Sequence, residues 1–165
     1  ELDKFNQEVA QENIPAFGMG VGINTGLVVV GNMGSTQRFD YTCLGDSVNL
    51  ASRLEGQSKS YGVQLVVGES TVKASTRGYT FVELDKIAVK GKTKPETIYT
   101  VGEVDPVKHT QFLTKYYTGD WDKALDLAIE LSHGSKLHEY YRLMSERLAQ
   151  GCPEDWKGHY VATSK

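Results

Sequence analysis

The chain has 165 residues, of which 39% are hydrophobic and 24% charged, enough to bury one core and a small appendage. Its net charge of −3 brings no basic stripe of the kind that a nucleic-acid groove shows, so we expect no nucleic acid as a partner. Cys43 and Cys152 lie far apart without a CxxC or Cys/His cluster, which argues against a disulfide framework or a zinc site.

The first elements that the pattern predicts are a helix and a glycine-rich hairpin. Apolar residues recur at helical spacing from Leu2 to Val9 and stop before Pro15, which predicts a first helix. Residues 17–24 and 27–32 read as two strands that pair about the turn between them. The many glycines and polar residues here suit a hairpin better than a membrane-spanning helix.

A short strand and an amphipathic helix follow. Residues 39–44 are predicted to form a third strand, and residues 47–58 a helix. Gly45 permits the sharp turn between the two elements. Asp46 is expected to be the N-cap, with its carboxylate accepting a backbone N–H of the first turn.

The helix over residues 47–58 has one narrow polar stripe. Asn49 and Arg53 are four residues apart and therefore lie on one face, while Leu50 and Leu54 belong to the opposite, apolar side. A guanidinium presents five donors that suit phosphate oxygens, and an amide can donate to and accept from a ribose or phosphate. For a helix in isolation, the alternative is that the arginine pairs with an acidic residue on the surface.

The next segment alternates strands and helices. We predict a strand over residues 63–67, a short helix over residues 69–74, and a long hairpin of residues 79–89 and 97–104 that bends at residues 90–95. This order indicates an α+β fold, in which a sheet carries helices on one face.

From Asp105 onward the pattern becomes entirely helical, with regularly spaced leucine and aromatic residues. We therefore expect two parts, residues 1–104 and a helical extension over residues 105–165. The extension is predicted to be a helical hairpin with a tail, and the run from Gly119 to Leu125 resembles the start of a tetratricopeptide-type helix pair. Its apolar positions are interpreted as packing surface rather than a ligand-binding box.

The run from Arg38 to Glu55, RFDYTCLGDSVNLASRLE, resembles the class III nucleotidyl cyclases, and so does the glycine-rich hairpin before it. The resemblance extends more loosely from Leu2 to about Glu103, and Val-Lys-Gly-Lys at residues 89–92 matches a turn that the family places near the triphosphate. It implies a ferredoxin-like, cyclase-type sheet lacking its N-terminal strands. The implied reaction converts ATP to 3′,5′-cyclic AMP and diphosphate in signal transduction.

The resemblance also implies roles for individual residues. Thr42 corresponds to the residue that reads adenine, Asn49 to the one that orients the ribose, and Arg53 to the arginine of the transition state. Lys90 corresponds to the triphosphate lysine, with Lys92 close enough to substitute. Lysines around such a turn also have a simpler interpretation, because they commonly protect exposed strand edges.

The family holds Mg²⁺ or Mn²⁺ with two aspartates, which we expect N-terminal to this chain. Asp40 shares a strand face with Thr42, but no second carboxylate at suitable spacing accompanies it, so no metal ligand is assigned here. In the family, each active site forms across a dimer. We therefore expect a homodimer in which this chain supplies the base, ribose and phosphate contacts and is inactive by itself.

Alternatives remain open from the sequence. One is a catalytically inactive cyclase-like regulatory or dimerisation module, and another is a helical module that binds a protein partner. A third is a guanylate cyclase, since those enzymes commonly have cysteine in place of Thr42; here Cys43 is one position away and should point to the opposite face.

The location of the protein follows only from resemblance. The extension is similar to that of bacterial cyclases with a CHASE-type sensor, which implies a cytoplasmic catalytic end on a parent anchored in the bacterial inner membrane. The sequence opens without Met, as a piece of a longer protein would.

Overall fold

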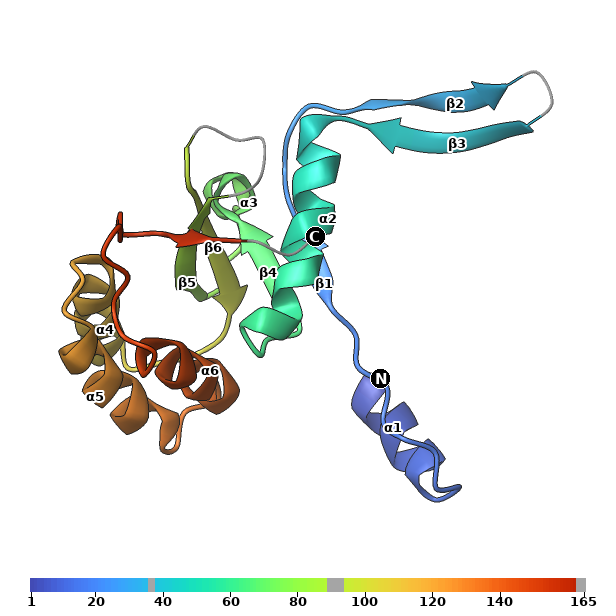
Figure 1. Cartoon of the computed structure of the whole chain (residues 1–165). Coiled ribbons are helices and arrows are strands. Elements are labelled where there is room, and N and C mark those ends of the chain that lie inside the picture. Colours follow the sequence, from blue (N-terminus) through green and yellow to red (C-terminus); the bar gives the residue numbers. More distant parts are fainter. Residues whose placement is uncertain (36–37, 89–93, 163–165) are drawn as a thin grey trace.

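The structure is a computed structural model that describes residues 1–35, 38–88 and 94–162 (Figure 1). The helices are α1 (Leu2–Ala10), α2 (Asp46–Ser60), α3 (Glu69–Ala74), α4 (Pro106–Tyr117), α5 (Trp121–Ser132) and α6 (His138–Leu148). The strands are β1 (Val21–Ile23), β2 (Val29–Ser35), β3 (Arg38–Leu44), β4 (Leu65–Gly68), β5 (Phe81–Ala88), β6 (Glu96–Val101) and β7 (Tyr160–Val161). The predicted α+β class is confirmed.

The strands form two separate sheets. A five-stranded sheet has the order β1-β4-β6-β5-β7, with parallel pairs at its two ends and antiparallel pairs between them. β2 and β3 form a two-stranded antiparallel arm that projects away from the rest of the molecule (Figure 1). α2 packs against β1 and β4, and the arm therefore joins the body where β3 runs into this helix.

The hairpin predicted from residues 17–24 and 27–32 is wrong. β1 pairs in parallel with β4, and β2 pairs with β3 instead. The side chain of Asn24 explains why the chain does not turn back directly after β1. Its Nδ2 donates to the Ser47 carbonyl oxygen at 3.2 Å, and its Oδ1 accepts from the Ser70 hydroxyl at 2.7 Å. These bonds tie the end of β1 to α2 and α3.

The start of α2 also differs from the prediction. Gly45 occupies the N-cap position with an extended backbone, and Asp46 is the first helical residue. The N-cap residue therefore contributes no side-chain hydrogen bond to the first turn. A carboxylate in the first turn still interacts favourably with the positive end of the helix dipole, which accounts for an acidic residue at this place.

Gly22 lets β1 and α2 approach closely. A Cβ atom at this position would overlap the carbonyl oxygen of Ala51 and the amide nitrogen of Glu55, both in the helix backbone. Backbone atoms cannot rotate away as a flexible side chain can, so any larger residue must displace α2 from the sheet. The glycine thus fixes the distance between the sheet and this helix.

The extension contains three helices and a strand rather than a helical hairpin. The additional helix is α4, which begins directly after Asp105. The carboxylate of Asp105 accepts from the backbone amides of Val107 and Lys108, each at 3.0 Å, and Pro106 occupies the first turn. A capping Asp followed by Pro is a strong helix start, and this signal lies at the boundary where the sequence pattern changes.

The extension covers one edge of the large sheet. The His109 ring Nε2 donates to the Glu83 carbonyl oxygen at 2.8 Å, and the Tyr140 hydroxyl donates to the Leu84 carbonyl oxygen at 2.6 Å. β7 pairs with the last two residues of β5. Burial lowers the pKa of His109, whose Nδ1 lies 2.9 Å from the Tyr141 hydroxyl. The polar edge of β5 is therefore bonded to the extension.

A single hydrophobic core joins the two parts of the chain. Its buried members from the sheet and α2 include Leu50, Leu54, Tyr61, Val66, Leu84, Ile87 and Ile98, and those from the helices include Phe112, Tyr116, Ala128, Tyr140 and Met144. Within the described ranges, no helix combines the length and apolar character needed to cross a membrane.

Candidate functional site

The predicted division of α2 into a packing side and a polar side is confirmed. Leu50 and Leu54 are 2% and 0% exposed and belong to the core. Asn49 and Arg53 are both exposed to solvent. The helix therefore presents an amide and a guanidinium, one turn apart, on the side that faces away from the sheet.

Thr42 is the third predicted contact, and it lies on β3 shortly before α2. It pairs with Gly31 of β2 and is exposed. β3 runs directly into the N-terminal end of α2 (Figure 1). Thr42, Asn49 and Arg53 thus belong to one continuous strand–helix segment at the base of the arm. Lys90, the predicted triphosphate lysine, lies outside the described residues.

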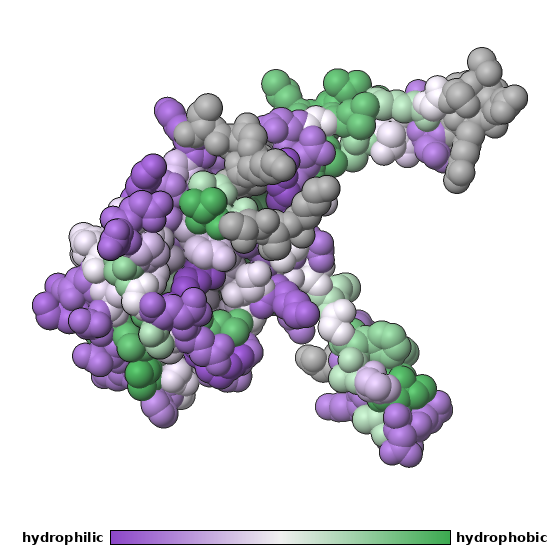
Figure 2. All heavy atoms as spheres, in the orientation of Figure 1, coloured by the Kyte–Doolittle hydropathy of each residue, from purple (hydrophilic) through white to green (hydrophobic). Residues whose placement is uncertain are grey.

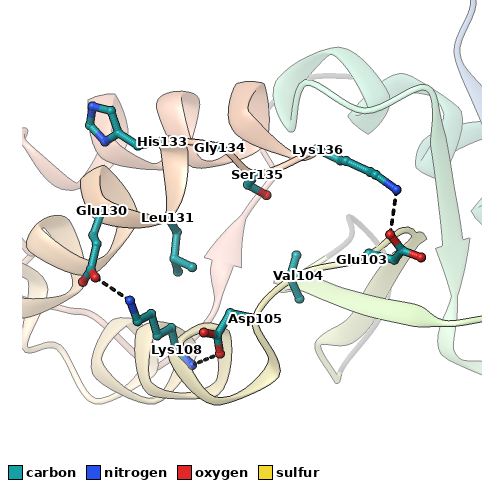
Figure 3. Close-up of a pocket in the computed structure, with 10 residues that line it drawn as sticks. All are labelled: Glu103, Val104, Asp105, Lys108, Glu130, Leu131, His133, Gly134, Ser135 and Lys136. Carbon is teal, nitrogen blue, oxygen red and sulfur yellow. Dashed lines mark hydrogen bonds and ion pairs between the residues drawn. The ribbon is translucent and has the colours of Figure 1, made fainter.

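The cavities of the body lie elsewhere. Figure 3 shows a hollow of about 370 Å³ between the start of α4 and the connection from α5 to α6. Its charged residues are already paired, with Lys108 to Glu130 at 2.5 Å and Lys136 to Glu103 at 2.6 Å. Two further cavities, of about 400 and 610 Å³, lie beside β7 and beside α4. Their lining residues are different from those of the strand–helix segment.

The predicted contact residues therefore form an open surface. None of Thr42, Asn49 and Arg53 lines any of these three cavities. An open surface cannot exclude water from a reaction without a second surface placed over it. Among the residues that the structure describes, no group of three or more His, Cys, Asp or Glu side chains could hold a metal ion.

A buried charge cluster was missed by the sequence interpretation. Asp85 of β5 is 0% exposed, and its carboxylate accepts from the hydroxyls of Tyr61 and Tyr116 at 2.6 and 3.1 Å. It also pairs with the guanidinium of Arg147 at 3.0 Å and accepts from the backbone amide of Lys86 at 2.7 Å. Burial raises the pKa of Asp85 to about 6, although Arg147 and the donors act to lower it.

Two signals in the sequence point to this cluster. Asp85 interrupts an apolar strand, between Leu84 and Ile87, where an acidic side chain is unusual without a buried partner. Arg147 shares a helical face with Tyr140 and Met144, at spacings of seven and three residues, and so belongs to the apolar side of α6. Nothing in the sequence says that these two residues meet.

The fold and the strand–helix segment are those of a nucleotidyl cyclase catalytic domain. The family of the adenylate and guanylate cyclase catalytic domain matches residues 1–102, and the chain belongs to that family.

Two of the relatives are bacterial adenylate cyclases. An adenylate cyclase of Anabaena cylindrica is 40% identical over 107 residues, which are 61% of this chain and 21% of the relative. Adenylate cyclase 1 of Rhizobium meliloti is 37% identical over 111 residues, which are 67% of this chain and 17% of the relative. The chain therefore spans about a fifth of the length of these curated relatives.

Solved structures show the same similarity. The guanylyl cyclase Cya2 superposes with a TM-score of 0.54 at 33% identity, over 64% of this chain and 52% of its own. The adenylyl cyclase CyaB from P. aeruginosa gives a TM-score of 0.54 at 31% identity, over 64% of this chain and 53% of its own. The expected cyclase-type fold is thus confirmed.

Proposed function

We propose that this chain is part of an adenylate cyclase that converts ATP to 3′,5′-cyclic AMP and diphosphate in cyclic-nucleotide signalling. The observation that carries the proposal is the exposed face of α2, where Asn49 and Arg53 stand together at the end of the strand that bears Thr42. The names of the curated relatives support the choice of ATP.

In this proposal, the residues act by positioning and by electrostatics. The guanidinium of Arg53 donates to the phosphate oxygens on which negative charge grows as the ribose 3′-hydroxyl attacks the α-phosphorus. The amide of Asn49 holds the ribose so that the attacking oxygen stands in line with the leaving diphosphate. The hydroxyl of Thr42 forms a hydrogen bond with the adenine edge.

We also propose Mg²⁺ or Mn²⁺ as the cofactor, because the resemblance to class III cyclases implies one of these ions. The described residues do not fit such an ion, because no cluster of ligands lies among them. In this proposal the ligands therefore come from other residues of the protein.

A homodimer with composite active sites would supply the missing second surface. The arm and the connection before it expose large apolar side chains, with Leu27 at 95%, Tyr41 at 77% and Val29 at 66%. Figure 2 shows hydrophobic residues gathered where the arm meets the body. Exposed apolar area of this kind marks an interaction surface. Replacing Tyr41 with Ser should shift full-length protein from dimer to monomer in sedimentation velocity, whereas Tyr79→Ser, at an exposed site before β5, should not.

The activity is tested directly with the full-length protein, ATP or GTP, and each of the two metal ions. We expect cyclic AMP as the main product, identified by chromatography and mass. Formation of cyclic GMP alone would favour a guanylate cyclase. The similarity to the guanylyl cyclase Cya2 keeps this activity as the second candidate. A folded protein that forms neither product would favour the inactive regulatory module. Membrane anchoring and a cytoplasmic catalytic end stay predictions from the sequence.

A further inference from the structure

The extension holds the C-terminal end of α2. Tyr61 is the C-cap residue of this helix, and its ring lies 5.0 Å from the guanidinium carbon of Arg147 on α6. At the next residue, Gly62 has a φ of +62°, and a Cβ atom there would lie 2.5 Å from Cγ of Glu139, also on α6. α6 and the end of α2 are therefore in direct contact, although α6 lies beyond the segment that matches the cyclase family.

The Asp85 carboxylate connects this contact to the sheet. It accepts hydrogen bonds from Tyr61 at the end of α2, Tyr116 of α4 and Arg147 of α6. One buried group therefore joins three helices to β5. A buried carboxylate needs its counter-charge and its donors in place, because water cannot replace them. The bonding of Asp85 therefore specifies where the end of α2 must lie.

The fixed end is close to the proposed catalytic residues. Arg53 precedes Tyr61 by eight residues, which is about 12 Å along a helix. α2 is a single regular helix between these positions, so a shift at its end carries through to its exposed face. A misplacement of about 1 Å in a catalytic group can cost about 100-fold in rate.

We propose that Arg147 is a positioning residue, which holds α2 through Tyr61 and the Asp85 carboxylate. In this way the extension sets how Asn49 and Arg53 are presented to the nucleotide. This inference rests on the cyclase function proposed above.

The first test uses two variants of the full-length protein. Tyr61→Phe removes only the hydroxyl that bonds the Asp85 carboxylate. Arg147→Met by itself would leave that carboxylate without its counter-charge and can fail to fold, so it is combined with Asp85→Asn. We expect kcat to fall about tenfold or more in both, with the KM for ATP changed less than about twofold. The control is Lys123→Met, which removes an exposed cation of α5 whose ion pair with Asp120 lies within the extension.

A second readout does not depend on catalysis. Hydrogen exchange of the α2 amides around Asn49 and Arg53 should become faster in both variants, while exchange in α3 stays unchanged as an internal reference. If the wild-type protein forms no cyclic nucleotide, the proposed function fails and the exchange result alone decides the positioning role. Wild-type kcat in folded Tyr61→Phe and in the double variant, or unchanged α2 exchange, would overturn the proposal.

Discussion

The arm and the helical extension expose their aromatic and aliphatic residues very differently. In the extension, Phe112, Tyr116 and Tyr140 are fully buried. On the arm side, Leu27 and Tyr41 are 95% and 77% exposed, and Figure 2 shows hydrophobic residues at the surface where the arm meets the body. The extension thus completes its packing within this chain, whereas the arm and the exposed face of α2 present surfaces for something else. Substitutions in the two regions should therefore fail in different ways.

Arg53→Ala should have the largest effect on activity with the least effect on stability. Because the side chain is exposed, we expect the free energy of unfolding to change little, while kcat falls about 10² to 10³-fold, or roughly 3–4 kcal/mol of transition-state stabilisation. Steady-state cyclic AMP formation by the full-length protein measures the effect. Lys59→Ala, on the same helix, is the matched control. A folded Arg53→Ala protein with wild-type kcat would contradict the proposed role.

The buried cluster should respond to pH instead. The pKa of Asp85 rises from 3.8 in an unfolded chain to about 6, so its protonated form favours folding. Its contribution to stability is complete below about pH 4 and is lost as the pH rises through about 6. The difference in free energy of unfolding between wild type and Asp85→Asn should therefore turn against wild type by up to about 3 kcal/mol over this range. Urea unfolding of both proteins at several pH values provides the measurement.

The opposite pH dependence of this stability difference would contradict a raised pKa of Asp85. If the advantage of wild type over Asp85→Asn grew with pH, the attraction of Arg147 would outweigh burial, and the pKa of Asp85 would be lowered in the folded protein.

A third substitution tests the contact between sheet and helix. Gly22→Ala places a methyl group against the backbone of α2, and we expect it to lower the free energy of unfolding by about 1–3 kcal/mol. Gly18→Ala is the control, because a Cβ atom there meets nothing within 4 Å. Denaturant unfolding measures both. Equal stability of the two variants would show that α2 yields to the methyl group without cost.

The smallest effect concerns the nucleotide base. Thr42→Ala removes one hydroxyl from an exposed strand, so we expect the ratio of kcat/KM for ATP to that for GTP to fall about three- to tenfold, the value of one hydrogen bond. Thr42→Ser keeps the hydroxyl and should keep the ratio. An unchanged ratio in Thr42→Ala would place base selection at other residues.

Local patterns predicted the individual elements well. The spacing of Leu50 and Leu54 identified the packing side of α2, and the apolar spacing from Leu2 identified α1. These predictions succeed because helical periodicity is a property of neighbouring residues. The roles of Thr42, Asn49 and Arg53 stay predictions, and they derive from a motif rather than from geometry.

Pairing between distant segments was harder to predict. The residues of β1 look able to pair with β2, and only the bonds of Asn24 to α2 and α3 show why the chain continues past that turn. Asp85 and Arg147 are 62 residues apart, and each alone has the appearance of an ordinary charged residue. Contacts of this kind depend on the complete fold, which local spacing does not encode.

The helical extension protects the edge of β5, and this protection would be lost in a shorter protein. Residues 1–102, the segment that matches the family, would retain β5 but lose His109, Tyr140 and β7, which bond to its outer edge. An uncovered strand edge beside an exposed apolar face invites pairing with another chain. We therefore expect a protein cut at this boundary to aggregate more readily than the 165-residue chain.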